Sequence, residues 1–377
     1  GHRGAPDSRR HAVGMARARR VGERRVLLAD VARGAGISES TASRALKDDP
    51  RIGEATREAV HASATTLGYV PNAAARSLRA RRTHILGLLL DDLADPVHGQ
   101  MAAGFEEAAS AQGYAVFMMT GLHDPERERR ALRTFVEHRA DGIVLASCVS
   151  APAEVYARVP KARVVFVKPE FPGLADGHAP DRGVLRSDDE AGMLAAVRHL
   201  VERGYRRIAY VDAGGGASDV MRRSAAALAL HGLLGEPMHV YDAGLEGWRD
   251  PSMVADALAA DRPDAVICYD DKLAIALMDA LRLTSLDVPA DIAVVGFDGI
   301  ALSARLRPRL TTVAVPSVEL GRRALGMLVA SARDGSLPPS EVLPVRLVIG
   351  ETTPPRQVTT NRRVASAGVV GTARGGG

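Results

Sequence analysis

The 377-residue chain has only two cysteines, one tryptophan and 4% aromatic residues. Two cysteines exclude the multi-disulfide framework of small secreted domains. Cys148 and Cys268 each lie in an apolar run typical of a buried strand, so we expect buried thiols. No apolar run approaches the roughly 18–20 residues that cross a membrane, and the basic N-terminus lacks the apolar core of a secretory signal. These absences predict a cytoplasmic globular protein that does not contact a membrane.

Sequence motifs for metal binding, phosphate binding and covalent catalysis are missing as well. The chain contains no HExxH, CxxC or GxSxG pattern. The glycine run 214–216 follows a predicted strand, but neither a Gly-Lys-Ser/Thr sequence nor GxGxxG spacing accompanies it. We interpret this run as a flexible loop. We therefore expect no metal, no cofactor, no catalytic residue and no enzymatic activity.

Charge is distributed unevenly along the chain. Residues 1–82 contain 17 Lys and Arg against 8 Asp and Glu, whereas the remainder contains 32 against 37. A basic N-terminal part on an acidic body favours contact with phosphates through that part. An Arg-rich arm accounts for some of the excess, and residues 1–25 are predicted to be such a disordered basic arm.

The stretch from Val26 to Leu46 has the pattern of two short helices joined by a tight turn. Apolar residues recur at helical spacing on both sides of a glycine-containing break: Leu27, Val31 and Ala32 before it, and Ala42, Ala45 and Leu46 after it. Ser38 stands where a hydroxyl can cap the second helix. The pattern describes a helix-turn-helix, whose second helix enters the DNA major groove. Two amphipathic surface helices are the alternative, and the segments that follow decide between them.

A third helix is predicted from Glu54 to Leu67, with Gly53 at its cap and Gly68 ending it. Its packing face is expected to comprise Ala55, Ala59, Val60, Ala62, Ser63 and Thr66.

Several segments, in order and spacing, resemble the lac-repressor/purine-repressor (LacI/GalR) family of bacterial transcription regulators. They are DVARGAGIS (30–38), STASRAL (40–46), TREAV (56–60), LGYVPNAAARSLR (67–79) and RTHILG (82–87). The resemblance implies a DNA-binding headpiece, a hinge helix, a two-lobed effector-binding core and a homodimer. The implied function is a sequence-specific transcriptional regulator, a repressor, controlled by a sugar or related metabolite.

The resemblance and the residue chemistry together predict the contacts with double-stranded DNA. Glu39, Ser40 and Arg44 are expected to read base edges, since Arg pairs with guanine and Glu accepts from cytosine. Phosphate contacts or hinge orientation are assigned to Thr41, Ser43 and Asn72. Basic side chains on the hinge are contributed by residues that include Arg76 and Arg79.

Leu78 matches the hinge leucine that wedges into the minor groove in the resembling family. An apolar wedge beside basic residues kinks the duplex. The alternative is a plain linker whose Leu78 packs on the headpiece. Two headpieces related by a twofold axis imply a near-palindromic operator.

From Thr83 onward, apolar strands alternate with helices, which favours parallel sheets covered on both faces. The predicted strands are 85–90, 115–119, 142–146, 164–167, 207–211, 265–269 and 292–296, and the predicted helices are 97–111, 126–137, 191–203 and 273–281. The fold class is therefore an all-α helix-turn-helix headpiece plus an α/β core. The resemblance implies two parallel-sheet lobes, as in periplasmic sugar-binding proteins, with the effector in the cleft between them.

These patterns predict a division of the chain into five segments. They are a basic disordered arm (1–25), a helix-turn-helix domain (26–70), a hinge helix or linker (71–82), a two-lobed effector-binding and dimerisation core (83–356) and a disordered tail (357–377).

Three predicted strand ends carry paired aspartates, at 91–92, 188–189 and 270–271. Such carboxylates can hold a metal, act as acid and base, or accept hydrogen bonds from sugar hydroxyls. They can also cap the following helices, which is the expected role for at least one member of each pair.

The resemblance selects particular residues for effector binding. It points to Asp92, Asp188 and Asp271 among the pairs, and to Arg222, with Arg223 as the alternative one position away. His98 stands near the place where the family often has aromatic residues, so it either contacts effector or has no ligand role. Trp248 lies in a glycine-containing loop, where contact with effector and a packing role are both open.

Overall fold

The computed structural model describes residues 26–70, 82–171, 182–214, 216–244 and 250–356. The chain divides between Arg81 and Arg82 into two compact units. We call the described part of the first unit the headpiece (26–70) and that of the second the core (82–356). The predictions for the N-terminal arm, for Asn72, Arg76, Leu78 and Arg79, for Trp248 and for the tail lie outside the described residues.

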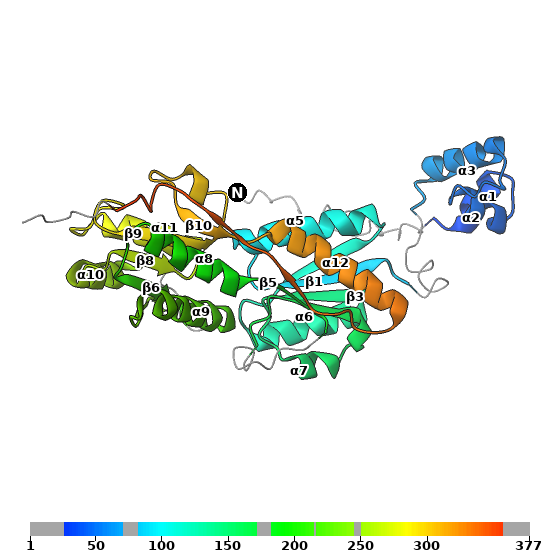
Figure 1. The fold of residues 1–377 in the computed structure, drawn as a ribbon. Helices are drawn as coiled ribbons and strands as arrows, with labels where there is room; N and C mark the ends of the chain where they lie inside the picture. The colour runs from blue at the N-terminus through cyan, green and yellow to red at the C-terminus, as the bar shows by residue number, and fades with distance from the viewer. Residues whose placement is uncertain (1–25, 71–81, 172–181, 215, 245–249, 357–377) are drawn as a thin grey trace, which may run out of the picture. The chain divides into compact units, whose positions relative to one another are not determined.

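The headpiece consists of three helices around a small apolar core (Figure 1). They are α1 (Leu28–Gly34), α2 (Glu39–Ala45) and α3 (Glu54–Leu67). The turn between α1 and α2 contains Gly36 at φ +68°, a left-handed conformation that suits glycine. The Ser38 side chain accepts a hydrogen bond from the Thr41 backbone N–H and so caps α2. The predicted helix-turn-helix is confirmed.

Helix α3 has the predicted bounds but a different packing face. Gly53 precedes it without a side-chain cap, and Gly68 ends it at φ +64°. Val60 is buried and Ser63 is half-buried, with its hydroxyl bonded to the Val31 carbonyl of α1. The predicted burial of Ala55, Ala59, Ala62 and Thr66 was wrong, since all four are exposed. Alanine fits either surface, so its apolar character does not fix the buried face.

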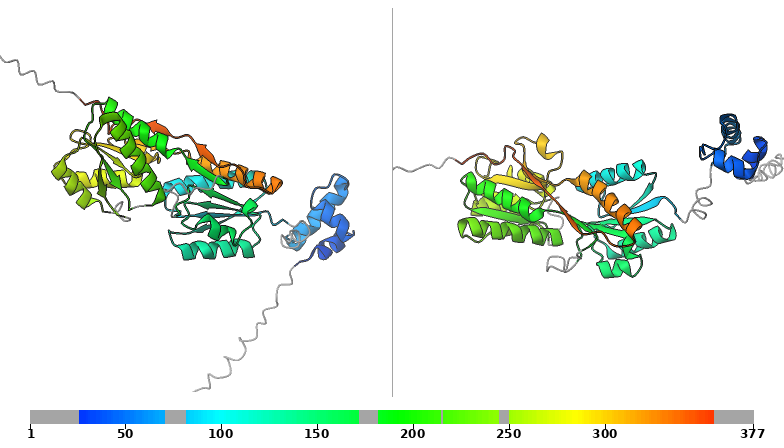
Figure 2. Two further views of the ribbon diagram at one scale, coloured as in Figure 1. Left: turned by 60° about the horizontal axis from the view of Figure 1, so that its bottom comes forward. Right: turned by 45° about the vertical axis from the view of Figure 1, so that its right-hand side comes forward.

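The core contains two six-stranded sheets, each with helices on both faces (Figures 1 and 2). The sheet of the N-lobe has the order β11-β5-β4-β3-β1-β2. Its strands are β1 (Ile85–Leu90), β2 (Ala115–Thr120), β3 (Gly142–Ala146), β4 (Val164–Val167), β5 (Val184–Ser187) and β11 (Glu341–Leu343). Its helices are α5 (Pro96–Ala111), α6 (Pro125–Glu137), α7 (Pro152–Tyr156), η1 (Lys161–Arg163) and α12 (Ser317–Asp334).

The sheet of the C-lobe has the order β12-β10-β9-β8-β6-β7. Its strands are β6 (Ile208–Asp212), β7 (His239–Asp242), β8 (Ala265–Cys268), β9 (Ala293–Asp298), β10 (Thr311–Ala314) and β12 (Arg346–Val348). Its helices are α8 (Asp189–Glu202), α9 (Ala217–Leu234), α10 (Ser252–Asp261), α11 (Asp271–Leu281) and η2 (Ser303–Arg305). All strand pairs within the two sheets are parallel except β10 with β12.

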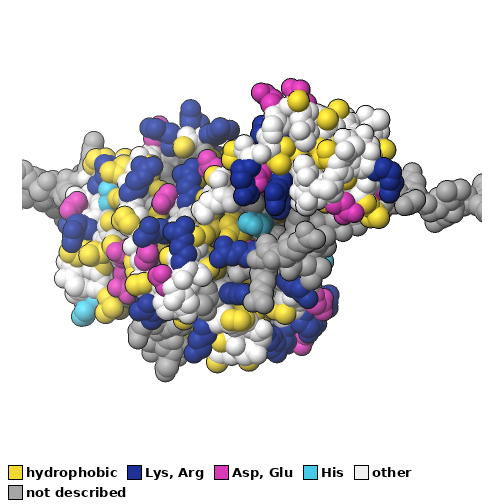
Figure 3. All heavy atoms as spheres, turned by 90° about the vertical axis from the view of Figure 1, so that its right-hand side faces the viewer, with side chains coloured by type: hydrophobic (Ala, Val, Ile, Leu, Met, Phe, Trp, Pro, Cys, Tyr) yellow, Lys and Arg dark blue, Asp and Glu magenta, His cyan; other side chains and the backbone are white. Residues whose placement is uncertain are grey.

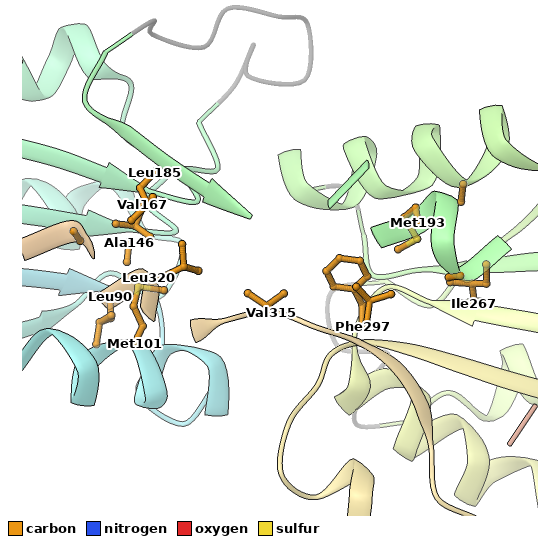
Figure 4. Packing of buried hydrophobic residues seen from close by; sticks show 14 of the residues in the cluster. Leu90, Met101, Ala146, Val167, Leu185, Met193, Ile267, Phe297, Val315 and Leu320 are labelled. Atoms are coloured by element: carbon orange, nitrogen blue, oxygen red, sulfur yellow. The ribbon is translucent and has the colours of Figure 1, made fainter. Parts of the chain in front are cut away.

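The chain passes between the lobes three times, from β5 to α8, from β10 to α12 and from β11 to β12. Helix α12 thereby returns to the N-lobe and lies alongside α5 (Figures 1 and 2). Gly104 and Gly321 permit this contact, because a Cβ at either position would clash with the backbone of the opposite helix. Buried apolar residues of both lobes form one cluster, with Val315 on a crossing segment between the two groups (Figure 4).

The fold confirms the predicted headpiece with a two-lobed α/β core. All seven predicted strands exist, with ends shifted by up to two residues. Five more strands were not predicted, because they are short and mix polar with apolar residues; they are β5, β7, β10, β11 and β12. Both cysteines are buried free thiols, but Cys148 lies in the loop after β3 and not in a strand. No helix in the described ranges is long and apolar enough to cross a membrane.

Candidate functional site

The exposed face of α2 carries the residues predicted to read DNA bases. Glu39, Ser40 and Arg44 are exposed, while Ala42 and Ala45 are fully buried against the rest of the headpiece. Residues 39, 40, 43 and 44 fall within one arc of the helix, opposite the buried alanines. The helix therefore presents a polar, short-chained surface with one long cation on it.

Three hydroxyls at the start of α2 bond to one another. The Oγ atoms of Ser38 and Ser40 are 2.9 Å apart, and Ser38 Oγ is also 2.9 Å from Thr41 Oγ1. Thr41 is half-buried, as is Ser43. The network fixes the first turn of α2 and so orients the exposed face.

Arg44 and Lys47 differ in their charge pairing from the other arginines of the described headpiece, Arg33, Arg51 and Arg57. Arg33 pairs with Asp30 at 3.0 Å, and Arg51 pairs with Asp49 at 2.7 Å. Arg44 makes no ion pair within 4 Å among the described residues. On the face shown in Figure 3, Lys and Arg side chains lie in several groups with Asp and Glu between them. An unpaired guanidinium is available to an external acceptor.

In the core, two of the three aspartate pairs cap helices as expected. Asp188 accepts from the Ala191 N–H at 3.0 Å, and Asp270 accepts from the Leu273 N–H at 2.7 Å. The pair 91–92 was wrongly expected to cap a helix, because Asp95 performs that role for α5. The carboxylate of Asp92 instead accepts from the Ala94 N–H within its own loop.

Asp271, predicted to bind effector hydroxyls, is completely buried behind β9 and β10. Its carboxylate accepts hydrogen bonds from Thr312 Oγ1 at 2.6 Å, Ser303 Oγ at 2.7 Å and the Ile300 N–H at 2.8 Å. Burial raises its pKa to about 7. These contacts give Asp271 a structural role in joining α11 to the loops that follow β9.

His98 is buried in the first turn of α5. Its Nδ1 lies 2.9 Å from the Asp92 carbonyl oxygen, and its Nε2 lies 2.9 Å from Ser147 Oγ. Both ring nitrogens therefore have partners in the described structure. His98 therefore connects the loop after β1 with the loop after β3, and it can hold these two loops in position.

Arg222, on α9, is a fully buried cation between aromatic rings and carboxylates. Its guanidinium donates to Asp189 Oδ2 at 2.8 Å and to Asp298 Oδ1 at 3.2 Å, and lies 3.8 Å from the Phe297 ring centroid. Burial alone would lower the pKa of Arg222, but the two carboxylates outweigh it and raise the pKa well above the usual value. The alternative, Arg223, is partly exposed and pairs with Asp212.

Contacts between the lobes lie beyond the carboxyl ends of strands in both sheets. Lys272 of α11 pairs with Asp95 of the N-lobe at 2.5 Å and lies 3.6 Å from Asp270. Glu170, which follows β4, accepts from the Ser218 N–H of α9 at 2.9 Å and from the Ser218 hydroxyl. We call this region the interlobe junction; ligands of open parallel sheets bind at such strand ends.

The sequence patterns did not identify several of these junction residues: Asp95, Glu170, Asp189, Ser218, Lys272 and Asp298. Asp298 ends a strand that was predicted to stop at Gly296, so it stood at a strand end without a paired neighbour to mark it. Asp189 was present in a recognised pair, but its partner Arg222 is 33 residues away. A search for single carboxylates after every predicted strand would have found Asp298.

Together, a helix-turn-helix unit and a two-lobed parallel-sheet core with polar strand ends define a ligand-controlled DNA-binding regulator. Residues 27–72 match the family described as bacterial regulatory proteins, lacI family, and residues 197–353 match the periplasmic binding protein-like domain. The HTH-type transcriptional regulator GalR of Escherichia coli (strain K12) is 32% identical over 314 residues, which cover 82% of this chain and 90% of GalR.

The ribose operon repressor of Escherichia coli (strain K12) is 30% identical over 318 residues, 80% of this chain and 91% of that protein. A crystal structure of the lac repressor dimer bound to operator and the anti-inducer ONPF matches with a TM-score of 0.76 at 25% identity, covering 87% of this chain and 99% of that one. The chain belongs to the lacI family of bacterial regulatory proteins. It is a DNA-binding transcriptional regulator of a family made of regulators and not of enzymes.

Proposed function

We propose that the protein is a homodimeric repressor that binds a near-palindromic operator through two headpieces. Glu39, Ser40 and Arg44 read base edges in the major groove, and Thr41 and Ser43 contact phosphates. The exposed, unpaired Arg44 on a rigidly capped helix supports this assignment. The lac repressor dimer on its operator, to which the chain is similar, supports the twofold arrangement.

The hinge residues Asn72, Arg76, Leu78 and Arg79 complete the proposed DNA contact. Their assignment rests on the sequence, with Leu78 as the minor-groove wedge. Under the proposed division of the chain, residues 71–82 join the helix-turn-helix domain to the core. A protein that acts on the chromosome in this way works in the cytoplasm, without enzymatic activity.

The proposed dimer interface lies on the edges of the two sheets. The parallel edge strands β2 and β7 end their sheets, and each exposes an apolar residue, Met118 and Val240. Leu283, which follows α11, has 90% of its surface exposed. Exposed strand edges with apolar side chains favour association with another chain. In a dimer with twofold symmetry, a second copy of the protein covers both of these edges with its own.

The proposed effector is a sugar that binds at the interlobe junction. Arg222, Asp298 and Asp270 are assigned to bind it, because they combine donors and acceptors beyond the strand ends. Asp92, Asp188 and His98 remain proposed effector contacts from the sequence. In the structure, Asp92 and Asp188 accept backbone N–H bonds, as Asp270 does, and His98 links the loops after β1 and β3. Ligand names among the relatives, such as the ribose operon repressor, support a sugar.

The proposal is tested by selecting genomic fragments with the purified full-length protein and measuring their affinity by fluorescence anisotropy with and without sugars. We expect the selected fragments to share a twofold-symmetric site. The affinity for this site should fall as the salt concentration rises, and it should change when the effector sugar is added. No preference over random duplex at physiological salt would refute DNA recognition. A preference that no sugar changes would refute the effector assignment alone.

A further inference from the structure

Two cations of the interlobe junction are each shared by two carboxylates. Arg222 lies between Asp189 and Asp298, with N–O distances of 2.8 and 3.2 Å. Lys272 stands in the same relation to Asp95 and Asp270, at 2.5 and 3.6 Å. An anion that enters the junction meets Arg222 and Lys272 with their charge already compensated. It also meets the excess negative charge of the surrounding carboxylates.

A third potential anion site, the N-terminus of α9, is occupied by the chain itself. The N-cap of this 18-residue helix is Gly216, which has no side chain to bond the first N–H groups. Helix N-termini attract anions for this reason. Here the Glu170 carboxylate of the opposite lobe accepts from the Ser218 N–H and hydroxyl. A phosphate would have to displace Glu170 to reach these donors.

Lys168 is the remaining cation of the region. It follows β4 and makes no ion pair within 4 Å among the residues that the structure describes. Its charge nevertheless helps Arg222 to hold the pKa of Asp189 below its usual value, against the raising effect of burial. With Lys168 included, five carboxylates face three cations in the described junction: Asp95, Glu170, Asp189, Asp270 and Asp298 against Lys168, Arg222 and Lys272.

We infer that the effector is an uncharged or cationic polyhydroxy compound, a free sugar or an amino sugar, and that phosphorylated and acidic sugars are excluded. Carboxylates accept hydrogen bonds from hydroxyl and ammonium groups, which such ligands supply. Like charges placed together without a counterion are strongly unfavourable in a buried site. This inference rests on the proposed effector role of the junction and narrows its chemistry.

The experiment compares matched ligand pairs on the full-length protein by calorimetric titration and thermal shift at constant ionic strength. The probes are ribose with ribose 5-phosphate, and glucose and glucosamine with glucose 6-phosphate. Inorganic phosphate alone is the third probe. We expect any sugar that binds to lose at least about a hundredfold in affinity on phosphorylation. A phosphorylated sugar that binds as tightly as its parent, or more tightly, overturns the inference.

Inorganic phosphate tests the junction even without a known sugar. We expect phosphate not to stabilise the wild type in a saturable way. Saturable stabilisation that is lost in Lys168→Gln would show an anion site and overturn the inference. Asp95→Asn keeps a capping side chain on α5 but leaves Lys272 with one carboxylate. Its stabilisation by phosphate should exceed that of the wild type, because the excess of carboxylates in the junction falls from two to one, whereas Asp279→Asn, on the exposed side of α11, should behave as the wild type. Equal behaviour of the two variants contradicts charge compensation.

The outcomes separate this inference from the proposed function. If operator affinity responds to a phosphorylated sugar and not to its parent, the proposed effector control stands and the exclusion of anions is wrong. If operator affinity responds to neither member while Asp95→Asn gains phosphate binding, the exclusion stands and the effector role of the junction is wrong.

Discussion

Two arginines on helices, Arg44 in the headpiece and Arg222 in the core, have the same side chain in opposite environments. Arg44 is exposed and unpaired among the described residues, while Arg222 has 1% of its surface exposed and contacts two carboxylates. An exposed guanidinium is hydrated and remains available to bind a partner outside the fold. A buried one must be paired within the fold, because transfer of an isolated charge out of water is prohibitive.

The contrast extends to whole regions of the chain. Residues 26–70 contain five Lys and Arg against six Asp and Glu, so the folded headpiece is not itself basic. Residues 1–25 contain eight Arg against two acidic residues, and residues 71–82 contain four Arg and no acidic residue. The charge that attracts a polyanion therefore lies in the flanking segments. The headpiece contributes the geometry of α2.

The largest effect is expected from Arg222→Ala. The substitution leaves Asp189 and Asp298 buried without their cation, which costs about 3–5 kcal/mol in the free energy of unfolding. Denaturant titration of the full-length protein measures this loss. Arg223→Ala is the matched control: Arg223 is itself partly exposed and pairs with one carboxylate, that of Asp212, so this variant should lose less stability. Equal losses for the two variants would contradict the assigned burial of charge.

A pH effect is expected from Asp271, whose pKa burial raises to about 7 in the folded protein. Between its unfolded pKa near 4 and this value, the unfolded chain loses a proton that the folded protein keeps. The free energy of unfolding should therefore fall as pH rises from about 4 to 7, and this contribution should level off above 7.

Asp271→Asn removes this contribution, so its stability relative to the wild type should rise across the same pH window. One pKa unit corresponds to about 1.4 kcal/mol, which limits the effect to a few kcal/mol. Thermal unfolding in a series of buffers checks it, with Asp279→Asn as the exposed control. A constant difference between wild type and Asp271→Asn from pH 4 to 7 would show that burial does not shift the group.

The smallest of the three effects is expected for Arg44, the exposed arginine of the comparison. Arg44→Ala should weaken specific operator binding by about 1–3 kcal/mol, through the loss of a base contact. Its unfolding free energy should change little, because Arg44 makes no ion pair within 4 Å among the described residues and only its charge acts on the carboxylate of Asp49. Anisotropy on the selected operator measures the affinity, with Arg33→Ala on α1 as the control. A loss that is the same on random duplex would make Arg44 a phosphate contact and not a base reader.

How far the sequence predicted each region follows from the range of its contacts. The bounds of α3 and the cap of α2 depend on residues three or four positions apart, and both were predicted. The choice between Asp271 and Asp298 depends on Thr312, Ser303 and Arg222, which are distant in the chain. Local spacing identified aspartates at strand ends but carried no information about which oxygen would meet Arg222.

The amino-acid sequence by itself determined the helix-turn-helix, seven apolar strands in their order, and the family. The helices and strands follow from side-chain periodicity and from local hydrogen bonds, and the family follows from the order and spacing of the matching segments. Only the tertiary structure decided that α12 returns to pack on α5, that Asp271 is enclosed while Asp298 meets Arg222, and that Lys272 joins Asp95 across the lobes. Three chain crossings bring these groups together, and the need to neutralise charge out of water selects their partners.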